Sequence, residues 1–188
     1  MEGYKVFVYH VVTDRPMYVG QRIIFDEEHH SGVYQRVYDK IDIVNDIYAN
    51  PDKYDAEKLE HHTSVALREL ALEEVRQKKY PQYPSRMGCL YVSKSFEEAE
   101  NWGKFFSEIG RPTYHIVKLD VKGNCFMGDA TKCFKGQLSR EENLRLAEIY
   151  WENSVDTGNQ HSICEMLVNG EIVVVEIVKE INANIESN

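Results

Sequence analysis

Four residues of this chain have the chemistry and the order expected of a ligand-binding site. Tyr91 and Trp102 stand on either side of a segment of ten residues, within the stretch from Gly88 to Trp102. Two aromatic rings that face each other across a turn form a slot for a flat ligand. His10 precedes this stretch and Glu165 follows it, and they add an imidazole and a carboxylate that can bind polar groups.

A strand followed closely by a helix must position the two rings. Residues 88–92 form a short apolar segment, which predicts a buried strand. Ser95 is a favourable N-cap and Glu98, three positions later, completes a capping box, so a helix is predicted over Ser95–Ile109. Gly110 and the proline that follows end this helix. Because only a few residues separate the strand from the helix, the two rings can fold back toward each other.

The histidine and the glutamate belong to β segments near the two ends of the chain. The histidine lies near the end of the β-rich segment Tyr4–Val12, and the glutamate lies in the predicted strand Ile163–Val168. A further strand, Ile172–Val178, follows after Asn169-Gly170. An Asn-Gly pair between two apolar runs is a strong hairpin signal, so these last two strands are predicted to pair with each other.

Helices predominate between these β segments. Apolar residues recur at helical spacing over Val33–Tyr48, and the Asn50-Pro51 pair ends that helix. A second helix is predicted from about Asp55 to Lys79, so an inserted helical hairpin spans about residues 33–80. The other predicted elements are a short strand or extended segment at Tyr18–Phe25, a strand at Thr113–Val121, a short edge segment at Cys125–Met127 and a helix from Ser139 to about Glu152. Loops are predicted at Asp26–Gly32, Gly128–Gly136 and Asp156–Gln160, and a frayed tail at Asn182–Asn188. This order predicts a single α+β domain over residues 1–188.

The composition limits the partners of the chain. It has 188 residues, of which 43% are hydrophobic, and its 22 basic and 31 acidic residues give a net charge of −9. This size suits one packed core, and the negative charge argues against binding to nucleic acid or to an anionic membrane. The four cysteines include no Cys-x-x-Cys pair and the N-terminus has no apolar targeting segment, so a cytoplasmic protein with reduced thiols is predicted.

The order and spacing of His10, Tyr91, Trp102 and Glu165 resemble the ADP-ribosyltransferase superfamily. The closer match is the branch shared by diphtheria-type toxins and poly(ADP-ribose) polymerases, which has a His-Tyr-Glu triad and a second aromatic residue at the spacing seen here. Its glutamate is followed by three apolar residues and a turn, as by Met166–Gly170 in this chain. The resemblance covers about half of the chain in four short patches. It implies an ADP-ribosyltransferase-like split β-sheet core with a helical-hairpin insertion, in a bacterial branch of the superfamily.

What the resemblance implies is an enzyme whose substrate is NAD. Nicotinamide, which is flat and cationic in NAD, would stack between Tyr91 and Trp102, and His10 would hydrogen-bond the adenosine ribose. Cleavage of the nicotinamide–ribose bond passes through an oxocarbenium-like state, which the carboxylate of Glu165 would stabilise while it holds the ribose 2′-hydroxyl. ADP-ribose would pass to a protein or small-molecule acceptor, whose identity stays open.

Three positions depart from the pattern of the superfamily. Trp102 stands where tyrosine is usual, which keeps the stacking and removes a hydroxyl. Val11 follows the histidine where the polymerases carry glycine. Ile163 stands two residues before the glutamate, where toxins that modify arginine or asparagine carry glutamine or glutamate, so modification of protein arginine is not expected.

Two alternatives stay open beside the enzyme. A catalytically inactive descendant of the same fold would be a binding or interaction module, with Tyr91 and Trp102 as core aromatics, His10 as a structural histidine and Glu165 facing water. A related enzyme of this fold acting on RNA ends would need a basic surface, and the net charge of −9 argues against it.

Other side chains give weaker signals. His29-His30 and His61-His62 lack the spacing that places two ligands on one helix face, so no metal site is predicted. Arg86 and Arg111 flank the central strand and helix and could bind a diphosphate; the alternative is that both are ordinary surface arginines. Cys164 is predicted to be a buried thiol.

Overall fold

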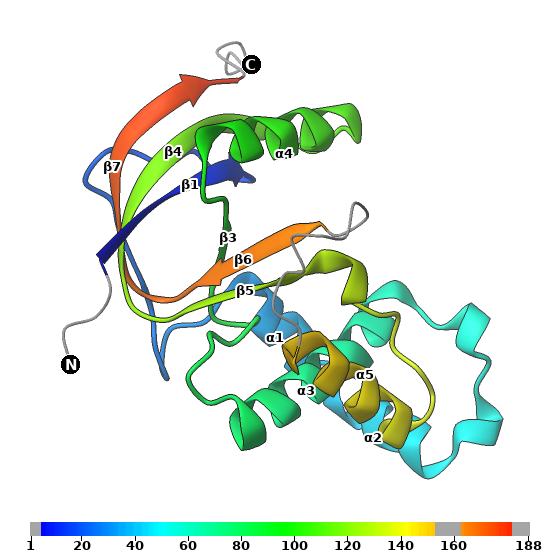
Figure 1. Ribbon diagram of the computed structural model, residues 1–188. Coiled ribbons are helices and arrows are strands. Elements are labelled where there is room, and N and C mark those ends of the chain that lie inside the picture. Colours follow the sequence, from blue (N-terminus) through cyan, green and yellow to red (C-terminus); the bar gives the residue numbers. More distant parts are fainter. Residues whose placement is uncertain (1–4, 153–162, 182–188) are drawn as a thin grey trace. The chain divides into compact units, whose positions relative to one another are not determined.

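The computed structural model describes residues 5–152 and 163–181, and within these ranges it confirms the predicted α+β class (Figure 1). Its α-helices are α1 (Gly32–Tyr38), α2 (Ile41–Ala49), α3 (His61–Lys79), α4 (Phe96–Glu108) and α5 (Arg140–Glu152). Its strands are β1 (Lys5–Thr13), β2 (Arg22–Phe25), β3 (Leu90–Val92), β4 (Thr113–Lys122), β5 (Cys125–Asp129), β6 (Cys164–Val168) and β7 (Gly170–Glu180). Short 3-10 turns lie at η1 (Pro51–Lys53), η2 (Ala56–Lys58) and η3 (Ala130–Lys132). The predicted loop at Asp156–Gln160 and the predicted tail at Asn182–Asn188 lie outside the described residues.

The chain divides into two compact units. The sheet unit comprises Met1–Asp26, Leu90–Cys125 and Met166–Asn188, and the helical unit comprises Glu27–Cys89 and Phe126–Glu165. The chain passes from one unit to the other within β5 and within β6. The predicted insert belongs to the helical unit, which also contains α5.

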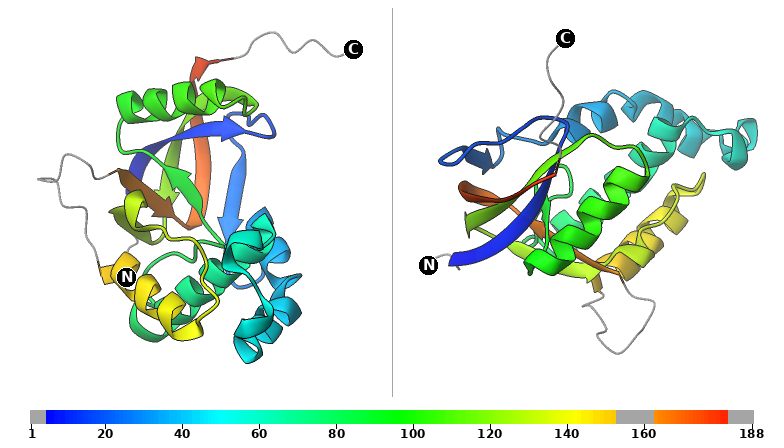
Figure 2. Two further views of the ribbon diagram at one scale, coloured as in Figure 1. Left: turned by 90° about the vertical axis from the view of Figure 1, so that its right-hand side faces the viewer. Right: turned by 90° about the horizontal axis from the view of Figure 1, so that it is seen from above.

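An antiparallel sheet with the strand order β1-β4-β7-β2 forms the centre of the sheet unit. Helix α4 packs against β1 and β4, as Figures 1 and 2 show for the green helix beside the dark blue strand. Val11, Ala99 and Ile116 form the buried centre of this contact. The packing therefore fixes β1, the strand that carries His10.

Local capping signals account for the ends of α4. The Ser95 hydroxyl accepts a hydrogen bond from the backbone N–H of Glu98 at 3.2 Å, and the Glu98 carboxylate accepts one from the N–H of Lys94 at 3.1 Å. Gly110 has a φ of +76°, which favours glycine and ends the helix. The predicted strand and helix on the two sides of Ser95 are confirmed.

The predicted hairpin of the last two strands is wrong. β6 belongs to a second sheet with the order β3-β6-β5, whereas β7 pairs with β4 and β2. The Asn169 backbone N–H donates a hydrogen bond to the Asn124 carbonyl at 3.1 Å, and the Asn169 side-chain oxygen accepts one from the Asn124 N–H at 3.1 Å. A Cβ added to Gly170, whose φ is +90°, would lie 2.4 Å from the Lys122 carbonyl oxygen. The Asn-Gly pair therefore marks a corner at which the chain leaves one sheet for the other.

The predicted helix over residues 33–48 is interrupted at Asp39 and Lys40, so it forms α1 and α2. The Lys40 N–H bonds to the Val37 carbonyl at 3.1 Å, a tight turn that changes the direction of the chain. Val37 of α1 and Val44 and Ile47 of α2 are all buried in one cluster with residues of α3. Tertiary packing explains the break, because the turn lets both short helices bury their apolar side chains there.

Helix α3 begins at His61, six residues after the predicted start. The Glu60 carboxylate caps it by accepting the N–H groups of His62 at 2.9 Å and Thr63 at 3.1 Å. The bond from His62 foremost, together with Lys40 and the bond from Thr63, lowers the pKa of Glu60 to about 2. The end at Lys79 is as predicted. α5 packs along α3 (Figure 1). The Trp151 indole N–H donates to the Leu72 carbonyl at 2.8 Å in this contact.

Candidate functional site

Three of the four predicted site residues lie in the sheet unit, and the fourth lies in the helical unit. His10 is on β1, Tyr91 on β3 and Trp102 on α4, whereas Glu165 on β6 is the last residue of the helical unit.

The structure brings His10 and Tyr91 together. The His10 Nδ1 donates a hydrogen bond of 2.7 Å to the Tyr91 carbonyl oxygen, which can only accept, so Nδ1 carries the proton. Two backbone hydrogen bonds between Tyr9 and Ser93, of 2.9 and 2.7 Å, hold the end of β3 beside β1. In the neutral ring Nε2 then has a free lone pair, which can accept a hydrogen bond from a hydroxyl group of a ligand.

The surroundings of His10 favour this neutral form. Burial lowers the pKa of His10, while the hydrogen bond to Tyr91 acts in the opposite direction and the charges of Arg111 and His115 lower it further. Arg111 lies at the surface, where it pairs with Asp14 at 3.3 Å and lies 5.0 Å from the centre of the Phe106 ring. His10 is thus a neutral hydrogen-bonding group in a positively charged neighbourhood.

Replacing His10 by asparagine should reduce the pH dependence of stability. Because the folded pKa of His10 is below its unfolded value, its contribution is fully present above about pH 6.5 and is lost as the pH falls toward the folded pKa. Asparagine can still donate to the Tyr91 carbonyl but does not titrate. Urea unfolding at pH 8 and pH 5 should show a smaller loss for His10→Asn than for wild type. Parallel losses would contradict this, and exposed His61→Asn is the control.

Tyr91 and Trp102 differ in their surroundings. The Tyr91 side chain is 43% exposed, so a ligand can reach it. Trp102 is half-buried in an aromatic cluster of α4, with ring centres 5.7 Å from Phe106 and 5.8 Å from Phe105, and it packs on the core beneath that helix. Trp102 therefore stabilises α4, whatever its part in binding.

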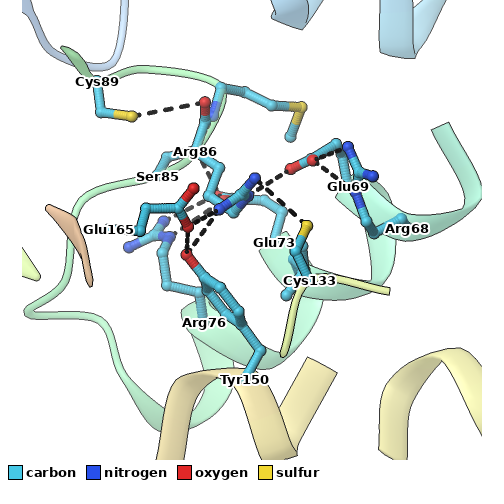
Figure 3. A network of polar contacts seen from close by, with 12 residues as sticks. Arg68, Glu69, Glu73, Arg76, Ser85, Arg86, Cys89, Cys133, Tyr150 and Glu165 are labelled. Atoms are coloured by element: carbon cyan, nitrogen blue, oxygen red, sulfur yellow. Dashed lines mark hydrogen bonds and ion pairs between the residues drawn. The ribbon is translucent and has the colours of Figure 1, made fainter. Parts of the chain in front are cut away.

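Glu165 is the acceptor in a network of charged and aromatic side chains (Figure 3). Its Oε1 accepts hydrogen bonds from the Tyr150 hydroxyl at 2.5 Å and from the Arg86 Nη1 at 2.6 Å. The Arg86 Nε donates to the Glu69 Oε2 at 3.0 Å, and the other oxygen of Glu69 accepts from the Arg68 Nε at 2.9 Å. Glu69, Arg86 and Glu165 are only 4%, 7% and 13% exposed. A buried carboxylate, Glu69, and a partly buried one, Glu165, therefore share one buried guanidinium group.

The interpretation of Arg86 as a surface arginine is wrong. Its guanidinium is buried because Glu69 and Glu165 compensate its charge from both sides, and it also lies 5.0 Å from the centre of the Tyr150 ring. Cys133 contacts it at 3.7 Å. One signal of this cluster was visible in the sequence and was missed, because Glu69 is a glutamate on the apolar face of a predicted helix.

Two of the cysteines have thiols that are poorly suited to nucleophilic chemistry. Burial raises the pKa of the Cys89 and Cys133 thiols, so both are protonated at neutral pH and are poor nucleophiles. Cys164 is half-buried rather than fully buried. Among the described residues, no three His, Cys, Asp or Glu side chains are grouped so that they could hold a metal ion. In the same part of the chain, no helix has both the length and the hydrophobicity required to cross a bilayer.

A known protein family matches most of this chain. Residues 8–180 match the model of a family described as protein of unknown function (DUF2441). The match covers most of the chain, so the chain belongs to this family, and every candidate residue above lies within the matched range. No curated protein matches the sequence significantly.

Proposed function

We propose that this protein is an NAD-dependent ADP-ribosyltransferase of the cytoplasm, which cleaves the nicotinamide–ribose bond and transfers ADP-ribose to a protein or small-molecule acceptor. The observation that carries the proposal is the hydrogen bond of 2.7 Å between the His10 Nδ1 and the Tyr91 carbonyl. It joins the first two members of the His-Tyr-Glu order through adjacent strands. It also makes the other ring nitrogen the unprotonated one, which can accept a hydrogen bond from a ribose hydroxyl.

Binding of NAD would use the exposed features of the sheet unit. The accessible ring of Tyr91 would stack on the cationic nicotinamide, with Trp102 as the second ring. Arg111, whose charge acts on His10, can give a bidentate contact to a diphosphate if it exchanges its exposed pairing with Asp14. These groups fit the aromatic, hydroxyl and phosphate parts of NAD.

The chemistry would require a carboxylate beside the reacting ribose. When the bond between nicotinamide N1 and ribose C1′ breaks, its electron pair leaves with nicotinamide and positive charge moves onto the sugar. The nucleophile of the acceptor then forms the new bond to C1′ and loses a proton. Glu165 would stabilise the positive charge more in the transition state than in bound NAD.

Titration calorimetry with NAD tests the proposal directly. We expect wild-type protein to bind NAD and to release nicotinamide, and we expect Tyr91→Ala to weaken NAD binding roughly tenfold by removal of a stacking contact. This variant keeps the backbone carbonyl that holds His10. Tyr18→Ala removes another exposed tyrosine of the same unit, 65% accessible, and is the matched control. Absence of NAD binding by wild-type protein would end the proposal.

One observation favours the inactive binding module as a second candidate. The Arg86 Nη1 lies 2.6 Å from the Glu165 Oε1, and this ion pair offsets negative charge that the transition state requires. A module of this kind would bind NAD or another nucleotide and leave it intact. Binding of NAD without release of nicotinamide would therefore select this alternative.

A further inference from the structure

Arg86 and Tyr150 bind the same oxygen of Glu165. Arg86 can only donate, so its Nη1 donates to the Tyr150 hydroxyl oxygen at 2.6 Å. The single hydroxyl proton of Tyr150 is then directed to the Glu165 Oε1 at 2.5 Å. The arginine, the phenol and the carboxylate form a triangle in which the direction of each hydrogen bond is determined (Figure 3).

The triangle is held by rigid parts of the helical unit. Tyr150 is fully buried on α5, and its ring centre lies 4.9 Å from that of Trp151 and 5.4 Å from that of Phe126. Arg86 is held independently by Glu69 of α3 at 3.0 Å. Groups fixed by packing and by outer hydrogen bonds can impose one orientation on the side chain that they contact.

Arg86 and Tyr150 both bind the same one of the two oxygens of the Glu165 carboxylate. Within the described ranges, the hydrogen bonds found on this carboxylate end at Oε1. Two donors on one oxygen fix the plane and rotation of the carboxylate, and neither of these donors occupies Oε2, which can accept from a hydroxyl or lie against positive charge on a sugar. This geometry suits a carboxylate that must meet its substrate in one orientation.

We propose that Tyr150 and Arg86 are positioning residues, which hold the Glu165 carboxylate in the single orientation that its proposed part in NAD cleavage requires. The proposal rests on the proposed function, because it assigns these residues to the same reaction. Neither residue needs to touch NAD. Loss of the Tyr150 hydroxyl should therefore lower kcat and leave KM for NAD nearly unchanged.

Nicotinamide release by Tyr150→Phe tests this role. Removal of one hydrogen bond to a charged group should lower kcat about 10- to 100-fold, with KM within about twofold of wild type. Arg86→Lys keeps the charge but loses the planar fork, so it should lower kcat as well without restoring the orientation. Tyr48→Phe removes a hydroxyl that accepts from the Asn143 side chain at 2.8 Å in the same unit, and it should retain wild-type kcat.

Two kinetic results overturn the proposal in different ways. Wild-type protein that releases no nicotinamide would overturn the proposed function and this role with it. Active wild-type protein with an equally active Tyr150→Phe variant would overturn the positioning role alone. Proton NMR adds a readout that does not depend on turnover, because the Tyr150 hydroxyl proton should give a downfield resonance that is lost in Tyr150→Phe and shifts in Glu165→Gln. Absence of that resonance from wild-type protein would also contradict the role.

Discussion

Replacing Glu165 by glutamine should lower nicotinamide release from NAD by about 10²–10³-fold. Glutamine has nearly the same shape, and its amide oxygen can still accept from Arg86 or from Tyr150. It carries no negative charge, so it cannot stabilise the charge that moves onto the ribose in the transition state. NAD binding should change little, because the main contribution of the carboxylate is made in the transition state. Release at saturating NAD and calorimetry together measure the two effects.

The control for this experiment must separate chemistry from folding. Glu141→Gln, at an exposed position of α5, removes a charge of the same sign and should keep full activity. Far-UV circular dichroism should show that Glu165→Gln is folded, since Glu69 remains as a partner of Arg86. Equal release by Glu165→Gln and wild type would exclude a catalytic role for this carboxylate.

Local signals in the sequence predicted the elements that depend on local chemistry. The capping serines Ser95 and Ser139 accept the N–H groups of Glu98 and Glu142, both at 3.2 Å, and the helices begin where these signals lie. The Asn-Gly signal at Gly170 correctly indicates a turn with positive φ. The signal does not show which strand pairs with β7. The contact of Asn169 and Gly170 with the corner after β4 determines that pairing.

The candidate site also has one part that the sequence could predict and one part that it could not. The order of His10 and Tyr91 could be recognised in the sequence, and their contact follows from two adjacent strands. The surroundings of Glu165 could not be predicted, because Arg86 and Tyr150 reach it from positions 79 and 15 residues earlier in the chain. Periodicity describes one helix face at a time, and it cannot show that a charged residue on one element meets its partner on another.

Replacing Arg86 by methionine should destabilise the protein by about 3–5 kcal/mol. Methionine fills much of the same volume, so the main loss is electrostatic. Glu69 and Glu165 would remain 4% and 13% exposed in the present packing, without the cation that they share. Urea unfolding followed by circular dichroism measures the change. Arg145→Met removes an exposed arginine that pairs with Glu142 at 2.7 Å, and it should have little effect.

A second set of variants distinguishes unpaired charge from lost packing. If the instability of Arg86→Met comes from carboxylates left without a partner, adding Glu69→Leu and Glu165→Leu should recover much of it, because a buried ion cluster can often be replaced by apolar side chains of similar volume at little cost. If the instability comes from lost contacts with Tyr150 and Cys133, the triple variant should be no more stable than Arg86→Met. The first result would mean that this charged cluster is not required for folding, so that its presence needs an explanation in function, such as the orientation of Glu165.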